Sequence, residues 1–126
     1  MHGKHTMQAM SLRILVLLAL TASGVSRADL LSAQLAYSKG DYEKAFQDYR
    51  DLAELGQPTA QYNLAIMYAK GQGVRQSELE AYAWASLAAD NGDPNGRQLA
   101  DQLRSDLAPG SEKVADETRT RFGRQA

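Results

Sequence analysis

Apolar and polar positions divide the chain into helix-length segments separated by glycine and proline, and no segment shows the sustained alternation of a β-strand. This pattern predicts an all-α chain. We expect about six helices, over residues 30–39, 41–56, 58–70, 77–91, 94–107 and 111–122.

Part of the sequence recurs at a spacing of 36 residues. Ala45, Phe46, Ala53, Gly56 and Pro58 are followed at this spacing by Ala81, Tyr82, Ala89, Gly92 and Pro94. Self-similarity at such a period is typical of stacked helical hairpins, each burying its apolar face against the next. We therefore expect a scaffold that holds other molecules.

Two of the expected helices have clear start signals. Pro58 suits a first helical turn, where the amide hydrogen that proline lacks would be unpaired. Ser77 and Glu80 form a capping box. In such a box the serine hydroxyl accepts from the glutamate amide, and the glutamate side chain reaches back to the serine amide.

The N-terminus has the layout of a secretory signal peptide. Lys4 and Arg13 precede an apolar run over residues 14–20, and small residues follow up to Ala28. We expect cleavage after Ala28, which assigns residues 1–28 to the signal peptide and 29–126 to the mature domain. An uncleaved anchor is the alternative, but the run is shorter than the roughly 20 residues needed to span a bilayer. The true start codon stays open between Met1, Met7 and Met10.

Net charge and cysteine content limit which classes of partner and which cellular compartment the sequence allows. The expected mature chain has 11 basic and 15 acidic residues, a formal charge of −4, which argues against nucleic acid and anionic lipid as partners. The chain contains no cysteine, so it has neither a disulfide nor a lipid-acceptor thiol. We expect a periplasmic or secreted protein with no stable membrane insertion after cleavage.

The side chains available for catalysis are few. His2 and His5 are the only histidines, and both lie in the expected signal peptide. A Ser-His-Asp triad, a cysteine nucleophile and a zinc site with imidazole or thiolate ligands are therefore excluded from the mature chain. We expect no catalytic residue, cofactor or metal. Paired carboxylates could still hydrolyse glycosides, but Glu78 and Glu80 more ordinarily favour the positive end of a helix dipole.

The central residues carry a family resemblance. They are Ala60, Leu64 and Tyr68, the loop 71–74 of sequence Gly-Gln-Gly-Val, then Ala81, Trp84, Ala88, Ala89 and Gly92. Together they resemble one complete Sel1-like repeat, a longer-looped relative of the tetratricopeptide repeat, over about residues 58–92. Residues 40–56 resemble a shorter, tetratricopeptide-like unit, and residues 94–122 a degenerate closing pair. The resemblance implies a right-handed α-solenoid of stacked antiparallel helix hairpins.

Three positions depart from the pattern that the resemblance implies. Ala65 stands where the family usually has glycine, which suggests slightly wider helix packing. Ser77 replaces the usual aspartate at little cost, because both residues cap helices. Asp48 occupies the place of Trp84 in the first unit, which makes that unit a partial match.

Packing and binding roles can be separated along the helix over residues 58–70. Ala60, Leu64 and Tyr68 form the packed stripe, and we expect Trp84 to be core. A neighbouring face corresponds to the concave, ligand-holding surface of the superfamily. The resemblance therefore assigns a partner-binding surface to this face and to amides on the following first helix: Thr59, Tyr62, Asn63, Ile66, Gln98 and Gln102.

The leading hypothesis is an exported, non-enzymatic scaffold or adaptor that binds a protein or peptide in the cell envelope. One alternative is a binder of cell-wall material or polysaccharide, or a carboxylate-dependent enzyme acting on glycans, which requires two carboxylates facing each other across an acidic cleft. Another is a secreted factor that meets a host protein. The exposed ends of so short a stack also allow it to pair with a second copy as a homodimer.

Overall fold

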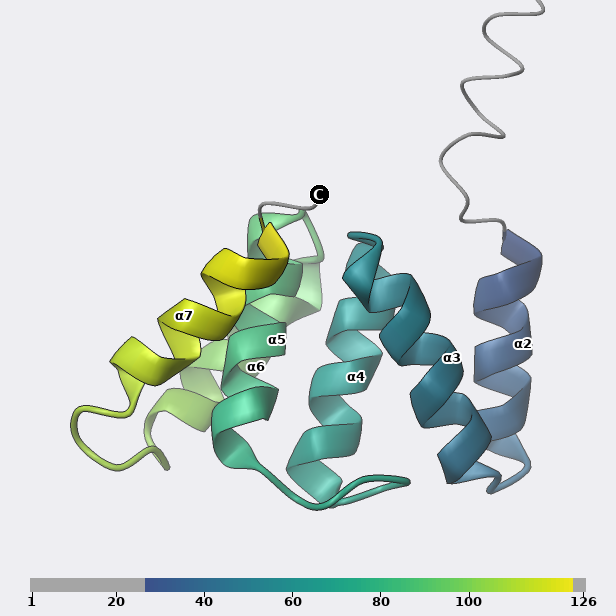
Figure 1. The fold of residues 1–126 in the computed structure, drawn as a ribbon, viewed down its shortest axis with the longest axis horizontal. Coiled ribbons are helices and arrows are strands. Elements are labelled where there is room, and N and C mark those ends of the chain that lie inside the picture. The colour runs from purple at the N-terminus through teal and green to yellow at the C-terminus, as the bar shows by residue number, and fades with distance from the viewer. Residues whose placement is uncertain (1–26, 124–126) are drawn as a thin grey trace, which may run out of the picture.

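The computed structural model describes residues 27–123. Within this range the chain forms helices and no strand, as expected for an all-α solenoid (Figure 1). The helices are α2 (Arg27–Ser38), α3 (Tyr42–Glu54), α4 (Pro58–Lys70), α5 (Glu78–Asp90), α6 (Pro94–Arg104) and α7 (Glu112–Gly123). The expected signal peptide, residues 1–28, lies outside the described residues except for the first two residues of α2, so its cleavage stays a prediction.

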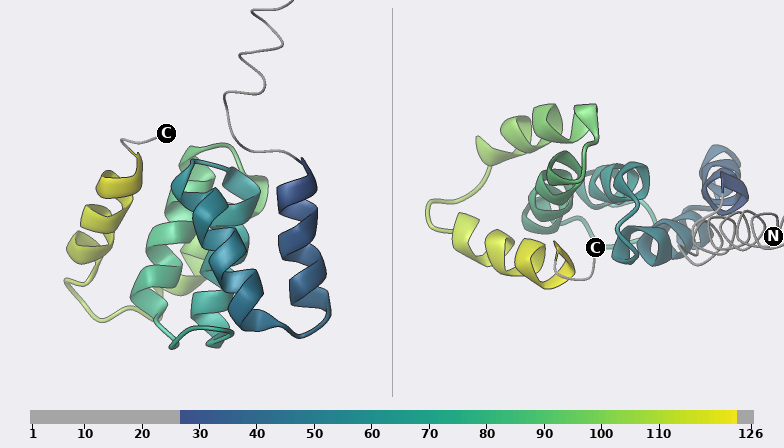
Figure 2. Two further views of the ribbon diagram at one scale, coloured as in Figure 1. Left: turned by 45° about the vertical axis from the view of Figure 1, so that its right-hand side comes forward. Right: turned by 90° about the horizontal axis from the view of Figure 1, so that it is seen from above.

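Helices that follow one another in the chain pack against one another from α2 to α6, and α7 packs on α5. Viewed from above, α6 and α7 diverge on either side of α5 (Figure 2). The chain therefore builds a short row of helices with α4 and α5 at its centre. None of the described helices combines the length and apolar character needed to cross a bilayer.

The boundaries of α4 and α5 agree with the sequence signals. Pro58 begins α4, and Gly71 ends it with a left-handed φ of 69°. The Ser77 hydroxyl accepts from the Glu80 amide at 3.2 Å, as the capping box predicts. The predicted reciprocal hydrogen bond, from the Ser77 amide to the Glu80 side chain, is wrong, because the Ser77 amide donates to the Tyr68 carbonyl at 3.0 Å.

Two of the outer helices differ from the expected ranges. The first helix begins at Arg27, three residues before the expected start. Helix α6 ends at Arg104, three residues before the expected end at Leu107. The chain turns there because the Asp106 amide bonds to the Leu103 carbonyl and the Leu107 amide to the Arg104 carbonyl, a tighter winding than that of an α-helix.

The residues that carry the repeat pattern form the core of the stack. Ala60, Leu64, Ala81 and Ala88 are fully buried, and Trp84 is 3% exposed. The indole of Trp84 lies 4.7 Å from the Phe122 ring, between centroids. The packing interpretation of Trp84 is confirmed, so the motif is used in joining one helix to the next.

A buried amide connects three of the helices. Gln61 on α4 is fully buried, and its Nε2 donates to the Ala53 carbonyl on α3 at 3.1 Å. Its Oε1 accepts from Asn91, which follows α5, at 3.0 Å. Because both ends of the amide are paired, the side chain joins two successive hairpins without an unsatisfied polar group.

The long loop between α4 and α5 folds back onto the first hairpin. Gly73 has a φ of 71°, and a Cβ there would lie 2.6 Å from the Tyr42 carbonyl carbon. Beside it, Gln72 accepts a hydrogen bond from the Tyr37 hydroxyl at 2.9 Å. Glycine is required at residue 73 both by its backbone angle and by this close approach.

Candidate partner-binding surfaces

The six predicted partner-binding residues lie on two helices. Thr59, Tyr62, Asn63 and Ile66 are half-buried on α4, and Gln98 and Gln102 are exposed on α6. The Asn63 side chain donates to the Thr59 carbonyl of its own helix at 2.9 Å. No described hydrogen bond joins the residues on α4 to those on α6. Their role in binding stays a prediction.

The junction between α3 and α4 is closed by packing. Phe46 and Tyr68 meet edge to face, with their ring centroids 5.4 Å apart. Ala65 is fully buried, as is Gln61 with its hydrogen bond to α3. Burial raises the pKa of the Tyr68 hydroxyl, and the nearby Glu80 carboxylate raises it further.

The α5–α6 junction is the equivalent of the α3–α4 junction, because its residues lie 36 positions further along the chain. Phe46 and Tyr68 correspond there to Tyr82 and Arg104. The Arg104 guanidinium donates to the Tyr82 hydroxyl at 3.0 Å and lies 5.7 Å from the centre of the ring. This hydrogen bond raises the pKa of Arg104. A cation on an aromatic face thus replaces a pair of aromatic rings.

Two further positions change in the same way. Gln61 and Ala65, both fully buried, correspond to Arg97 and Asp101, both exposed. Arg97, Asp101 and Arg104 are four and three residues apart, so they share one face of α6. We call these three residues the charged stripe. The sequence interpretation missed it, although applying the 36-residue register to the packed positions of α4 would have located it.

The charged stripe lines a groove between α6 and α7, with α5 beneath it. The cavity there has a volume of about 290 Å³. Its lining consists of Tyr82, Ser86, Ala89, Asp90, Arg97, Ala100, Asp101, Arg104 and Arg119. On the α7 side, Arg119 forms an ion pair with Asp90 at 2.5 Å, which raises the pKa of the guanidinium. The groove is therefore polar and carries charges of both signs.

A second cavity, of about 150 Å³, is lined by residues of α3, α5 and α7 and by Tyr68 of α4. Trp84 and Phe122 contribute aromatic surface, and Arg50 and Glu54 form an ion pair at its rim with 3.0 Å between Nε and Oε1. This cavity lies beside the α3–α4 junction, as the larger groove lies beside the α5–α6 junction. Its lining includes the Trp84 indole from α5, whereas the lining of the larger groove includes the Arg119 guanidinium from α7.

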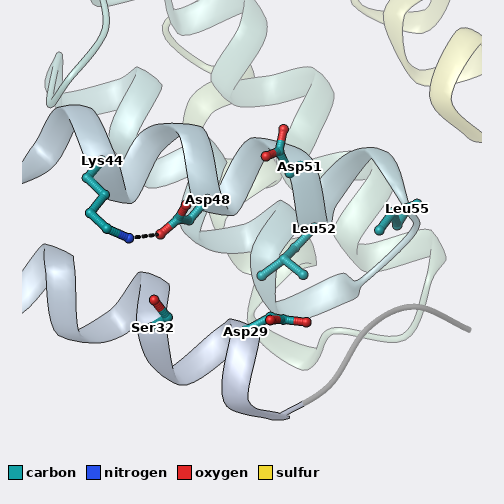
Figure 3. Close-up of a pocket in the computed structure, with 7 residues that line it drawn as sticks. All are labelled: Asp29, Ser32, Lys44, Asp48, Asp51, Leu52 and Leu55. Atoms are coloured by element: carbon teal, nitrogen blue, oxygen red, sulfur yellow. Dashed lines mark hydrogen bonds and ion pairs between the residues drawn. The ribbon is translucent and has the colours of Figure 1, made fainter. Parts of the chain in front are cut away.

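The α2–α3 hairpin holds a third cavity, of about 300 Å³ (Figure 3). It is lined by Asp29, Ser32, Lys44, Asp48, Asp51, Leu52 and Leu55. Lys44 pairs with Asp48 at 2.7 Å, and Figure 3 shows Asp51 directed away from α2. Carboxylates from both helices line this cavity, Asp29 from α2 and Asp48 and Asp51 from α3, so the glycan-hydrolase alternative stays a prediction.

One end of the stack has an apolar face. Leu31 and Leu35 on α2 are 62% and 56% exposed, and a spacing of four residues places them side by side. This face belongs to the end at which the predicted homodimer could form, and the homodimer stays a prediction. Among residues 27–123, no group of acidic or other ligating side chains is arranged to hold a metal ion.

The fold by itself defines a class of protein. Paired helices stacked in a row, with small and aromatic residues between them, form a helical-repeat solenoid, an architecture whose extended surfaces serve binding. Residues 58–93, the hairpin of α4 and α5, match the family model of the Sel1 repeat. The chain therefore contains a Sel1-like repeat over these residues, and proteins with such repeats act as protein-interaction scaffolds.

Three curated relatives are similar to parts of the chain. The alginate biosynthesis protein AlgK of Azotobacter vinelandii is 33% identical over 86 residues, covering 64% of this chain and 19% of the relative. Exopolysaccharide production negative regulators of Rhizobium leguminosarum bv. viciae and Rhizobium meliloti (strain 1021) are 42% and 40% identical over 57 residues. Each of these matches covers 45% of this chain and 21% of the relative. The chain thus spans about a fifth of the length of the relatives it matches.

Proposed function

We propose that this protein is an exported, non-enzymatic adaptor that binds a protein partner in the cell envelope and acts in the production of an exopolysaccharide or in its regulation. The observation that carries the proposal is the use of the repeat motif for packing. Leu64 and Trp84 are buried between helices, so the residues that define the family build the stack and leave recognition to its surface.

The printed names of the relatives support the exopolysaccharide part. One is an alginate biosynthesis protein and two are negative regulators of exopolysaccharide production. Export rests on the N-terminal pattern of Lys4, Arg13 and the apolar run over residues 14–20. The binding surface proposed here is the predicted one on α4 and α6, where Tyr62 and Gln98 occupy equivalent positions of the 36-residue register.

The proposal is tested with the tagged protein produced in its native host. Periplasmic extract and culture supernatant are assayed separately, and the periplasmic sample is crosslinked before purification. We expect the mature protein in the periplasm together with one reproducibly crosslinked protein, whose binding is then measured with both components purified. Protein found only in the supernatant would favour the secreted host factor, and a glycan recovered without any protein would favour the polysaccharide binder.

A surface variant locates the binding site. Tyr62→Ala combined with Ile66→Ala removes two half-buried side chains from the predicted face of α4. The matched control, Lys113→Ala with Glu117→Ala, changes two exposed residues of α7. We expect the α4 variant to bind the purified partner at least tenfold more weakly, and the control to bind it normally. Undiminished binding by a folded α4 variant would exclude this face.

A further inference from the structure

The charged stripe of α6 alternates in sign and is available to a ligand. Arg97, Asp101 and Arg104 are all exposed beside the cavity of about 290 Å³. Arg97 has no hydrogen-bond or ion-pair partner among the described residues, and Asp101 forms no ion pair there. Arg104 is bonded to a neutral hydroxyl, that of Tyr82. Among the described residues, no ion pair therefore holds a charge of the stripe, although the Asp101 and Glu112 carboxylates act on Arg104 from farther away.

We propose that this groove binds an α-helix of a protein partner whose facing stripe is acidic, basic and acidic. The inference rests on the proposed function, in which the partner is a protein. Arg97 and Arg104 are seven residues apart, about two helical turns or 10 Å along the axis. A helix laid along α6 presents its own residues at the same spacing, so three complementary pairs form in register. An extended strand repeats each face at about 7 Å and misses this spacing.

The acidic residues of the groove favour a protein over a uniformly charged polyanion. Asp101 stands between the two arginines, and Asp90 lies on the floor opposite. A polymer with a carboxylate on every unit would bring a like charge against Asp101, whereas Asp90 is already paired with Arg119. A protein helix can place a lysine or arginine opposite Asp101 and carboxylates opposite Arg97 and Arg104. Paired helices choose partners by such alternating charges.

Two of the three arginines in the groove are already held in place. The Tyr82 hydroxyl and ring position Arg104, and the Asp90 carboxylate positions Arg119. A guanidinium that is fixed before binding loses less side-chain entropy when its partner arrives. The Arg104 side chain is thus oriented before a carboxylate arrives. Arg97 has no such contact and becomes ordered only when the partner binds.

The test uses two helical peptides of defined charge. Both are alanine-based; one carries Glu, Lys and Glu at relative positions 1, 5 and 8, and the other Lys, Glu and Lys. Their binding to the purified protein is measured by fluorescence anisotropy at about 50 mM salt, where surface charges are weakly screened. We expect the acidic-basic-acidic peptide to bind at least tenfold more tightly, and high salt to reduce that difference.

Reversing the stripe should reverse the preference. The variant Arg97→Glu/Asp101→Lys/Arg104→Glu is expected to favour the basic-acidic-basic peptide by a similar factor. Arg75→Glu is the control, because Arg75 is exposed in the α4–α5 loop and outside the groove. Circular dichroism checks that each variant is folded. A preference that survives the reversal would overturn the proposal, as would equal binding of the two peptides or no binding of either.

An oligouronate serves as the third probe. Tighter binding of this carboxylated sugar than of either peptide, lost in the reversed variant, would overturn the helix proposal in favour of a polyanion. The proposed function is tested separately by the crosslinked partner. If the reversed variant captures the partner normally, the adaptor function stands and the groove proposal fails. If the unaltered protein captures no partner, the proposed adaptor function itself is overturned.

Discussion

At the α3–α4 junction Phe46 and Tyr68 pack edge to face, whereas the equivalent positions at the α5–α6 junction hold Tyr82 and Arg104. The helices follow the same 36-residue register at both places. What differs is whether the facing stripe is uncharged and largely covered, as Gln61, Ala65 and Tyr68 are, or charged and open to solvent. One repeat geometry therefore supports both internal stacking and an outward-facing groove, and a few side chains on the first helix of each pair decide between them.

The largest expected effect comes from moving a charge of the open junction into the closed one. Ala65 is fully buried on α4, and its equivalent on α6 is Asp101. Ala65→Asp places an unpaired carboxylate in the core, which should cost about 3–5 kcal/mol of unfolding free energy or prevent folding. The reciprocal change, Asp101→Ala, should stay within about 0.5 kcal/mol because that position is exposed. Urea unfolding followed by circular dichroism measures both, and similar losses would refute the distinction.

The next effect concerns how closely α6 approaches α5. Gly96 occupies the position of Ala60, and a Cβ at Gly96 would lie 2.7 Å from the Ala89 amide nitrogen and 2.9 Å from the Ala85 carbonyl oxygen. Gly96→Ala should therefore lower the unfolding free energy by about 1–3 kcal/mol, despite alanine's better helix propensity. Asn95→Ala, at an exposed neighbour, is the control and should change it little. A Gly96 variant as stable as the control would show that α6 can move away freely.

The stability of the α3–α4 junction should depend on pH through two tyrosines, Tyr49 and Tyr68. Burial raises the pKa of Tyr49 on α3 to about 12, and that of Tyr68 is raised for the same reason. In the unfolded chain both ionise near pH 10, so the stabilisation is fully present below that pH and is lost as the pH rises toward 12. The variant Tyr49→Phe/Tyr68→Phe should lose stability less steeply between about pH 10 and 12, as thermal unfolding at each pH would reveal. Parallel curves for the two proteins would exclude this cause.

The smallest expected effect is that of the exposed arginine itself. Arg104→Gln removes its hydrogen bond to Tyr82 and its contact with the ring. Both lie at the surface, where water screens them, so the unfolding free energy should change little, and less than in any of the variants above. A much larger loss in urea unfolding would mean that Arg104 closes the junction as Tyr68 does, and that the groove serves folding.

Local signals explain how much of the fold was predictable. Pro58, Gly71 and Ser77 fix helix ends through backbone angles and nearby hydrogen bonds, and the bounds of α4 and α5 followed from them. The predicted hydrogen bond from the Ser77 amide to the Glu80 side chain was wrong, because that amide bonds to the Tyr68 carbonyl when the loop folds back. The predicted end of α6 was wrong because tighter turns form before Leu107.

The candidate site was less predictable than the fold. The burial of Trp84 followed from the repeat pattern. By contrast, the charged stripe reads in sequence as an ordinary solvated helix face, since Arg97, Asp101 and Arg104 are common surface residues. Its meaning depends on α6 lying beside α5 with α7 diverging on the other side, so that a groove remains (Figure 2). That arrangement is tertiary, and only the 36-residue register hints at it.

Amide hydrogen exchange of the protein, free and bound to its crosslinked partner, tests most directly whether the open junction is the one that meets a partner. We expect slower exchange in peptides covering residues 94–104 of α6 when the partner is bound, and unchanged exchange in the interior of the α3–α4 junction. Protection confined to α2 and α3, with α6 exchanging as in the free protein, would contradict it.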